Sequence, residues 1–221
     1  MSKLDYLKLN IATAIYTFFN KRDKGTIIVG AWMGTKFADN SRFLFQYLHE
    51  NKELLGLTNV VWATRDQGVN QMLNEMGYQS CLIGTDESKK WHLKAATHVI
   101  CNMAYDQIKF KADIDTKYSF GAKKIQLWHG VGFKAVGAAS NDTKKSAQKN
   151  SFFHGSKIAS LLSQGCWHES YVLCTSQYDV WINQTCMKRL DSRFFVSCYP
   201  RNCPCLRYLN YEKEVVDIIV K

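Results

Sequence analysis

The segment KKIQLWHGVGFKAVG, residues 123–137, decides how the rest of the chain is interpreted. It opens with a short strand candidate, residues 124–127, which we expect to be buried in a parallel sheet. His129 comes two residues after this run. In open α/β sheets, ligands bind just beyond the carboxyl ends of the strands. The segment therefore predicts a parallel sheet and a site at one edge of it.

His129 is the candidate catalytic residue of this segment. Histidine changes its protonation state near neutral pH, which suits it to take a proton from an attacking hydroxyl. Glycines at positions 130, 132 and 137 allow the backbone to approach a phosphate closely, and Lys134 adds positive charge. The pattern is compatible with an anion-binding loop. A histidine beside an aromatic residue is also common as a structural residue, so the spacing alone leaves both interpretations open.

Short β-rich runs alternate with longer amphipathic runs on both sides of this segment. The alternation is typical of βαβ units and predicts an α/β fold, with a parallel sheet and flanking helices. The expected strands are residues 26–31, 60–63, 79–83, 98–102, 124–127, 171–174 and 194–197. The expected helices are residues 41–51, 69–76, 87–96 and 176–187, the last with Ser176 as its N-cap. Residues 130–170 have weak periodicity and are expected to form a mobile loop with one or two short helices.

Residues 4–19 place apolar side chains at a helical period, with basic residues at both ends. The apolar positions are Leu4, Leu7, Ile11, Ile15 and Phe18. We expect an amphipathic helix whose apolar stripe packs on the domain, and a position on an anionic membrane face is the alternative. The chain has no run of about eighteen apolar residues, so no membrane-spanning helix is expected.

Composition narrows the classes of partner. A chain of 221 residues can form one substantial domain, and its net charge of +10 favours phosphates, nucleotides or acidic lipid surfaces. The basic residues form only short clusters without a nucleic-acid-recognition pattern, so no nucleic-acid binding is expected. Eight cysteines without an export signal indicate the reducing cytosol, where cysteine acts as a small hydrophobe. Cys203 and Cys205 are too close in sequence for a usual zinc site, and no metal or other cofactor is expected.

Four stretches, in the same order, resemble the CDP-glycerol glycerophosphotransferase family, which makes teichoic acids and related capsule polymers. QLWHG at 126–130, with Lys134 and Gly137, is similar to the family's Gln-x-Trp-His-Gly-Thr-x-x-Lys-x-x-Gly element. WMGTKFADN at 32–40 is similar to its first loop and helix, and AATHVICN at 95–102 to the strand before the histidine. YPRN at 199–202 is similar to its Gly-x-Pro-Arg-Asn-Asp element. The similarity covers roughly residues 25–206.

The resemblance implies a Rossmann-like parallel sheet that corresponds to the first domain of a GT-B architecture. We expect an N-terminal helix over residues 1–24, an acceptor-side domain over residues 25–206 and the start of a second domain over residues 207–221. The matching histidine of the family is held to be a catalytic base, which maps to His129. The implied reaction moves glycerol phosphate from CDP-glycerol to a hydroxyl of a lipid-linked polyol-phosphate acceptor. The implied location is the cytoplasmic face of the cell membrane, as a peripheral protein.

The resemblance also implies roles for residues around the histidine. Phosphate or substrate contacts are expected from Gly130, Gly132, Lys134, Arg201 and Asn202. The acceptor side is expected to include Lys36, Asp39 and Asn40. Asp39 and Asn40 are equally interpretable as caps of the helix expected to begin at Ser41. Trp32 and Trp62 are expected to be core aromatic residues.

The chain departs from the family pattern in two places and in length. Val131 stands where the family has threonine, and Cys203 where it has an acidic residue. The family continues into a second domain that holds the donor nucleotide, so a separate donor-domain polypeptide is an expected partner. Two alternatives remain: a non-catalytic acceptor-binding or assembly module or an inactive fragment, and a GT-B transferase of another CDP-polyol or nucleotide sugar.

Overall fold

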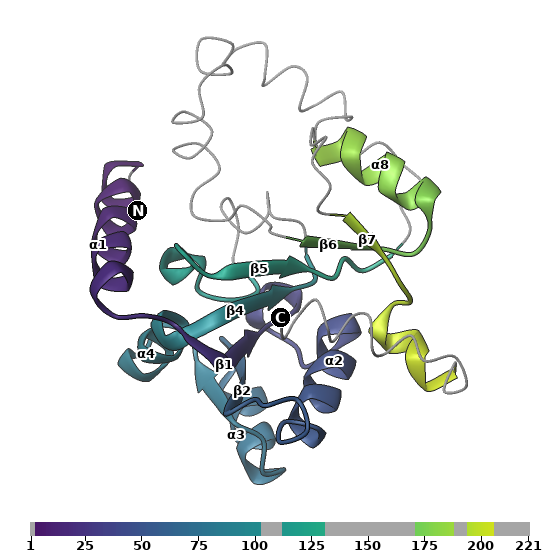
Figure 1. Cartoon of the computed structure of the whole chain (residues 1–221). Coiled ribbons are helices and arrows are strands. Elements are labelled where there is room, and N and C mark those ends of the chain that lie inside the picture. The colour runs from purple at the N-terminus through teal and green to yellow at the C-terminus, as the bar shows by residue number, and fades with distance from the viewer. Residues whose placement is uncertain (1–2, 103–111, 131–170, 188–193, 206–221) are drawn as a thin grey trace.

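The computed structural model describes residues 3–102, 112–130, 171–187 and 194–205 (Figure 1). Its strands form one parallel sheet in the order β3-β2-β1-β4-β5-β6-β7. The strands are β1 (Asp23–Val29), β2 (Asn59–Thr64), β3 (Ser80–Leu82), β4 (Ala95–Ile100), β5 (Lys123–Gln126), β6 (Tyr171–Cys174) and β7 (Phe194–Val196). The helices are α1 (Lys3–Phe19), α2 (Asp39–Glu50), α3 (Gln67–Glu75), α4 (Asp86–Lys94) and α8 (Gln177–Met187). Short 3-10 turns are η1 (Trp32–Gly34), η2 (Thr116–Tyr118) and η5 (Pro200–Cys205). The predicted Rossmann-like α/β sheet is confirmed, and each expected strand lies within a few residues of its expected bounds.

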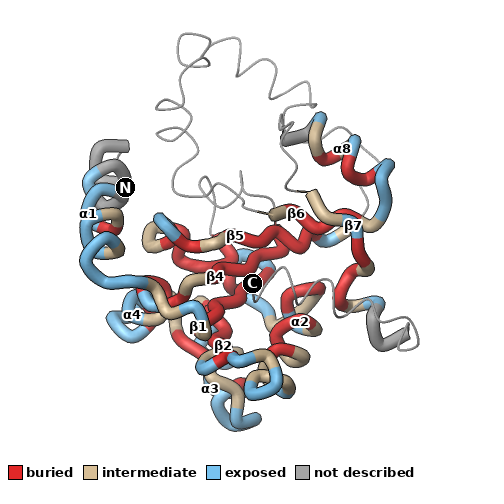
Figure 2. The backbone as a smooth tube through the Cα atoms, viewed as in Figure 1, coloured by how far each residue is buried: buried red, intermediate tan, exposed pale blue. Residues whose placement is uncertain are grey.

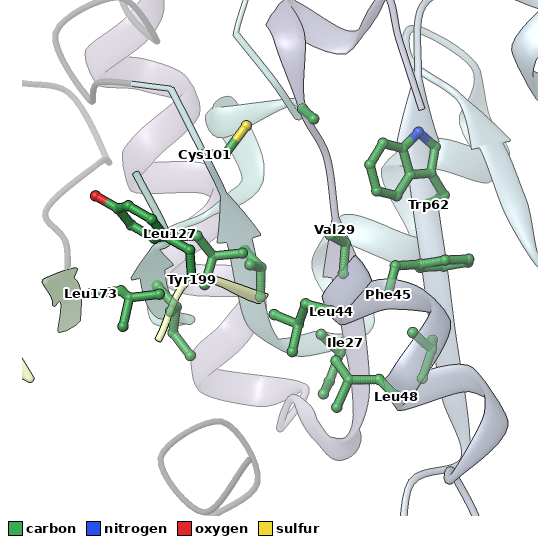
Figure 3. Packing of buried hydrophobic residues seen from close by; sticks show 14 of the residues in the cluster. Ile27, Val29, Leu44, Phe45, Leu48, Trp62, Cys101, Leu127, Leu173 and Tyr199 are labelled. Carbon is green, nitrogen blue, oxygen red and sulfur yellow. The ribbon is translucent and has the colours of Figure 1, made fainter. Parts of the chain in front are cut away.

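The central strands are apolar on both faces because helices cover both faces. Ile27 and Val29 of β1 belong to a cluster that also contains Leu44, Phe45 and Leu48 of α2 (Figure 3). Leu73 of α3 joins the same cluster, so α2 and α3 cover this face. On the other face, Ile28 packs in a second cluster with Trp91 of α4. A strand covered in this way reads in sequence as a continuous apolar run.

The strand order reverses direction at β1. β1 pairs in parallel with β2, with Ile27 opposite Val60, and on its other side with β4, with Ile27 opposite Thr97. The connections through α2 and α3 run outward to one side, and the connection through α4 returns to the other. Ligands in open α/β sheets bind at such a switch point, beyond the carboxyl ends of the strands. The exits of β1 and β4 are therefore the place to look for a site.

One predicted helix end is wrong, and one predicted helix cap is confirmed. The helix expected over residues 87–96 ends at Lys94, and Ala95 and Ala96 belong to β4. The helix stops there because Arg22 takes the carbonyl oxygens of its last turn, with Nη1 at 2.6 Å from the oxygen of His92. At α8, the Ser176 hydroxyl accepts a hydrogen bond from the Asp179 amide at 3.1 Å, as the N-cap prediction requires.

The helix expected to begin at Ser41 begins two residues earlier, at Asp39, and its N-cap is Ala38, which has no side-chain cap bond. Asp39 and Asn40 are therefore the first residues of α2 and not its N-cap, although the Asp39 carboxylate accepts the Asn40 amide at 2.8 Å. Their side chains also contact Arg201 and Trp128, which directs them to the sheet edge.

Helix α1 forms as predicted, but the described apolar side chains of its stripe face solvent. Thr13 faces the domain, with its hydroxyl 3.5 Å from the carbonyl oxygen of Lys117, and it is 3% exposed. Ile11, Ile15 and Phe18 are 52%, 55% and 80% exposed. Figure 2 shows the carboxyl-terminal half of this helix as mostly exposed, beside a buried sheet. For Ile11, Ile15 and Phe18, the expectation that the apolar stripe packs on the domain is wrong, whereas the side chains of Leu4 and Leu7 lie outside the described residues. No helix in the described ranges is long and apolar enough to cross a membrane.

The remaining expectations divide between core and surface. Trp62 is fully buried, as expected, whereas Trp32 is 40% exposed and is not a core residue. Cys81, Cys101 and Cys174 are buried free thiols, which fits their expected role as small hydrophobes. Burial raises the pKa of the Cys81 thiol to about 12, which keeps it protonated. The expected loop beyond position 130 and the expected second-domain start over residues 207–221 lie outside the described residues.

Candidate functional site

Backbone strain gathers where β1 and β5 end. In the described parts of the chain, the non-glycine residues with positive φ are Trp32 (47°), Met33 (58°), Asp39 (62°) and Trp128 (58°). Trp32, Met33 and Asp39 lie between β1 and the first residue of α2, and Trp128 lies two residues after β5. Such conformations cost about 1 to 3 kcal/mol each and persist only where the surroundings enforce them. Strain of this kind is common at functional sites, so this edge is the first candidate.

His129 sits at this edge with one ring nitrogen bound. Its Nδ1 lies 3.0 Å from the carbonyl oxygen of Cys101. Because a carbonyl oxygen only accepts hydrogen bonds, Nδ1 carries the proton in the neutral ring. The residue is exposed, and among the described residues Nε2 has no hydrogen-bond partner. The imidazole is therefore oriented with Nε2 as the nitrogen that can accept a proton.

The neighbouring Trp128 fixes the ring from the other side. Its indole is 5% exposed and stacks on the His129 ring, with centroids 4.9 Å apart and an interplanar angle of 23°. The Trp128 amide donates to Oε1 of Gln126 at 3.0 Å, and its carbonyl oxygen accepts from Nδ2 of Asn40 at 2.7 Å. Gln126 also donates through Nε2 to the carbonyl oxygen of Asn102. Two side chains thus hold both polar groups of the strained Trp128 backbone.

The structure brings four of the predicted site residues together around this turn. Asp39 Oδ1 lies 2.8 Å from Nη1 of Arg201, in an ion pair whose side chains are 6% and 35% exposed. The Arg201 amide donates to Oδ1 of Asn40 at 3.4 Å. Since Asn40 also binds the carbonyl of Trp128, the chain from Arg201 to His129 is continuous. This contact ties the Pro-Arg-Asn element, the start of α2 and the histidine turn into one unit.

Other predicted residues are less closely placed. Lys36 is exposed and its ammonium lies 5.1 Å from the centre of the Trp32 ring. Asn202 is exposed, and its amide donates to the carbonyl oxygen of Tyr199 at 2.8 Å. Gly130 has open space where a Cβ would stand. Gly132 and Lys134 lie outside the described residues, so the expected anion-binding loop stays a prediction.

Asp113, which was not among the predicted site residues, is fully buried at this edge. Its carboxylate accepts from the amides of Met33, Cys101 and Asn102 at 2.7, 3.1 and 2.9 Å, and from Nδ2 of Asn102 at 2.7 Å. Burial raises the pKa of Asp113, and these donors act against that rise. The carboxylate links the exits of β1 and β4.

Two sequence features could have pointed to Asp113. Residues 112–115 alternate apolar and acidic side chains in the segment between β4 and β5, with Ile114 fully buried. Gly30 allows the close approach, since a Cβ there would lie 2.3 Å from the carbonyl oxygen of Asp113. Within the described ranges, no group of three or more histidine, cysteine or acidic side chains is placed to hold a metal ion.

Comparisons with known proteins identify the family and the fold. The family model for CDP-Glycerol:Poly(glycerophosphate) glycerophosphotransferase matches residues 13–217. The structure is similar to that of the wall teichoic acid polymerase TagF, with a TM-score of 0.58 and 15% identity, over 97% of this chain and 50% of TagF. A histidine-to-asparagine TagF variant soaked with CDPG for 30 minutes gives a TM-score of 0.59 and 15% identity, over 97% of this chain and 51% of that one. No curated protein matches the chain.

The two kinds of comparison support different conclusions. At 15% identity, the likeness to TagF shows the fold, a Rossmann-like domain of the GT-B type. The chain spans about half the length of the TagF chains that it matches. The family match covers most of the chain and includes the histidine turn, both strands beside it and the Pro-Arg-Asn element.

Proposed function

The chain belongs to the CDP-glycerol:poly(glycerophosphate) glycerophosphotransferase family, and on this basis we propose that it forms the acceptor-side half of a transferase. The enzyme moves glycerol phosphate from CDP-glycerol to a hydroxyl of a lipid-linked polyol-phosphate acceptor. His129 is the general base. The observation that carries this proposal is the orientation of His129, with Nδ1 bound to the Cys101 carbonyl and Nε2 left for a substrate.

The reaction requires one proton acceptor and positive charge around the phosphorus atom. The acceptor hydroxyl oxygen attacks the β-phosphorus of CDP-glycerol, and the bond from that phosphorus to the bridging oxygen breaks. CMP leaves with the bonding electrons, and the hydroxyl proton passes to Nε2 of His129. Phosphoryl transfer depends mainly on in-line positioning and on charge at the phosphate oxygens.

We expect the positive charge to come from Arg201 and from Lys134. The ion pair with Asp39 engages Nη1 of Arg201, and a guanidinium carries five N–H donors in all. Asp39 therefore orients Arg201 while other donors face a phosphate. Lys134, Gly130, Gly132 and Asn202 remain proposed phosphate or substrate contacts, and Lys36 a proposed acceptor-side contact.

We propose that a second domain holds the donor nucleotide, and the span of the chain, about half the length of TagF, supports this. That domain comes either from the remainder of a longer chain or from a separate polypeptide. The test incubates the purified chain with CDP-glycerol and a lipid-phosphate acceptor, with and without a donor domain of the same family, and measures CMP release. We expect CMP only when both halves are present.

Three results would change the proposal. CMP from the chain alone would remove the need for a donor domain. Acceptor binding without CMP in either arm would support the non-catalytic module. CMP release with another CDP-polyol, and none with CDP-glycerol, would support the related GT-B transferase.

The membrane face is a further part of the proposal, supported by α1. Phe18 and Phe19 are 80% and 76% exposed, and Ile11 and Ile15 are more than half exposed. The exposed Lys8 lies on the same helix, and the exposed Lys21 and Lys24 follow it. Apolar side chains flanked by lysine match a surface of anionic lipid head groups.

Vesicle sedimentation tests this part separately from the chemistry. We expect the chain to bind phosphatidylglycerol-containing vesicles more strongly than neutral ones. Replacing Phe18 and Phe19 by serine should weaken binding at least about 10-fold, because each buried aromatic ring contributes about 1.5 to 3 kcal/mol. Leu54→Ser is the control, since Leu54 is 84% exposed elsewhere on the domain. Equal loss of binding in both variants would remove α1 from the membrane contact.

A further inference from the structure

The hydrogen bond from His129 continues beyond its acceptor. The Cys101 carbonyl that binds Nδ1 belongs to the peptide unit between residues 101 and 102. The N–H of that same peptide unit, on Asn102, donates to Oδ2 of Asp113 at 2.9 Å. One amide group therefore separates a buried carboxylate from the imidazole, with the carboxylate on its N–H side and the imidazole on its C=O side.

We infer that Asp113 is the positioning residue for His129 and acts through this peptide unit. A negative charge at the N–H end of an amide draws the proton toward it and increases the electron density on the carbonyl oxygen. Hydrogen bonds in a chain polarise one another in this way. The Cys101 oxygen becomes a stronger acceptor for Nδ1–H, which fixes one tautomer of the ring and favours a proton on Nε2 during the reaction.

The surroundings of Asp113 fit an ionised carboxylate. Its oxygens accept four N–H bonds, two on each oxygen, and an N–H group can only donate. A carboxylate that accepts several N–H bonds is stabilised in its charged form. Three of the donors come from the β4 exit and one from Met33 after β1. The contact with Met33 also helps to hold its positive φ of 58°.

The carboxylate is also prevented from moving away from the sheet edge. The segment that carries it packs on β1 at Gly30, so closely that a Cβ at that position would lie 2.6 Å from the Ile114 side chain. Ile114 is fully buried in the cluster of the α4 face. Packing therefore sets the position of Asp113, and hydrogen bonds set the positions of the β4 exit and of His129.

The catalytic consequence rests on the proposed function, but the orientation of the ring does not. The experiment therefore uses the chain without substrate. Two-bond nitrogen–proton spectra of the ¹⁵N-labelled chain, taken above neutral pH where imidazoles are uncharged, distinguish the two tautomers. The His129 signals are assigned by their absence in His129→Gln. We expect the Nδ1–H tautomer in the wild-type chain and a protected Asn102 amide.

Asp113→Asn removes the charge and leaves the shape. We expect it to lose the Nδ1–H signature and return the ring to the Nε2–H form that free histidine favours in water. Asp115→Asn is the matched control, because Asp115 is a buried carboxylate of the same segment that pairs with Lys117. It should keep the Nδ1–H form.

Three outcomes would overturn the inference. The first is an Nε2–H tautomer in the wild-type chain, and the second an unchanged tautomer in folded Asp113→Asn. The third is free exchange of the Asn102 amide in the wild-type chain, which needs no variant to fold. A failed CMP assay would leave all three measurements unaffected, so the two proposals fail separately.

Discussion

Two buried histidines, His92 and His98, contrast with the exposed His129, and the contrast shows how the same type of side chain has a structural role in one place and a candidate catalytic role in another. His92 of α4 and His98 of β4 are fully buried, and each ring has both nitrogens bonded. His92 places Nδ1 2.7 Å from the Ser88 carbonyl oxygen and accepts the Asp115 amide on Nε2 at 2.9 Å. His98 bonds the Ser119 hydroxyl at 2.9 Å and the His92 carbonyl oxygen at 3.0 Å.

His129 at the carboxyl edge differs in one respect. Its Nδ1 is bonded and its Nε2 has no partner among the described residues, on a side chain that is exposed. A ring with both nitrogens bonded has no capacity left for a substrate, so it stabilises the fold. A ring with one nitrogen bonded has a fixed tautomer and one reactive atom. Whether the second ring nitrogen has a hydrogen-bond partner therefore distinguishes a structural histidine from a candidate base.

The largest expected effect tests whether His129 is a general base. His129→Ala should lower CMP release, assayed with the donor domain, by about 10²- to 10⁴-fold, the usual contribution of a general base. Its free energy of unfolding should stay within about 0.5 kcal/mol of wild type, because the residue is exposed. Urea denaturation and the CMP assay measure the two quantities. Wild-type turnover in this variant would return His129 to the structural group.

The next largest effect concerns the surroundings of the buried histidines, where Arg22 binds the end of α4. Arg22 donates from Nη1 to the carbonyl oxygens of His92, Leu93 and Ala95, and from Nη2 to two oxygens near η2. Arg22→Ala leaves these carbonyls without that partner at the end of α4 and should reduce the free energy of unfolding by about 3 kcal/mol. Urea denaturation measures the loss.

Arg22→Lys is the matched control for this change. Lysine keeps the charge but cannot reproduce a planar fork with two nitrogens, so its loss should be intermediate. A loss equal to that of the alanine variant would show that fork geometry, and not charge, is what matters. A loss below about 0.5 kcal/mol for alanine would contradict the role assigned to Arg22.

The fold could be predicted from sequence because burial on both faces leaves a direct pattern. Continuous apolar runs such as residues 171–174 correspond to strands, and the serine before α8 correctly predicts its cap. The orientation of α1 could not be predicted. An apolar stripe shows that a helix is amphipathic, but Thr13 docks and Phe18 is exposed because of the surface that the helix meets.

The site could be predicted only in part, because its residues meet through backbone groups. His129, Arg201 and Asn40 were found from sequence stretches, and the structure joins them through the carbonyl of Trp128. Asp113 was missed since its partners are mainly amides, which leave no pattern of side chains in the sequence. A buried carboxylate of this kind becomes recognisable only when the strands are in register.

The third effect is the pH dependence of the free energy of unfolding, which the two buried histidines cause. Burial lowers the pKa of His92 to about 4, and burial also lowers the pKa of His98. An unfolded histidine has a pKa of about 6.5, so between these values the unfolded chain binds a proton that the folded chain does not. The free energy of unfolding is therefore fully present above about pH 6.5 and falls as the pH decreases.

The expected loss from His92 alone is about 2 kcal/mol by about pH 5, and His98 adds to it in the same direction. Urea denaturation at about pH 7.5 and about pH 5 measures it while most carboxylates stay charged. His92→Gln removes one titrating ring and should flatten the dependence. A wild-type stability that is constant over this range would show that neither buried ring is held neutral.

The smallest effect tests whether the buried histidines and His129 are independent, and it changes no histidine. Thr85 is the N-cap of α4, and its hydroxyl accepts the Ser88 amide at 3.2 Å. Thr85→Ala should cost about 1 kcal/mol of unfolding free energy, and Thr85→Asp should restore most of it, since aspartate also caps well. Because α4 carries His92 but contributes nothing to the turn at His129, CMP release with the donor domain should keep its wild-type rate. A rate that falls with Thr85→Ala would mean that the stability of α4 reaches the carboxyl edge, and the two groups of histidines would no longer be independent.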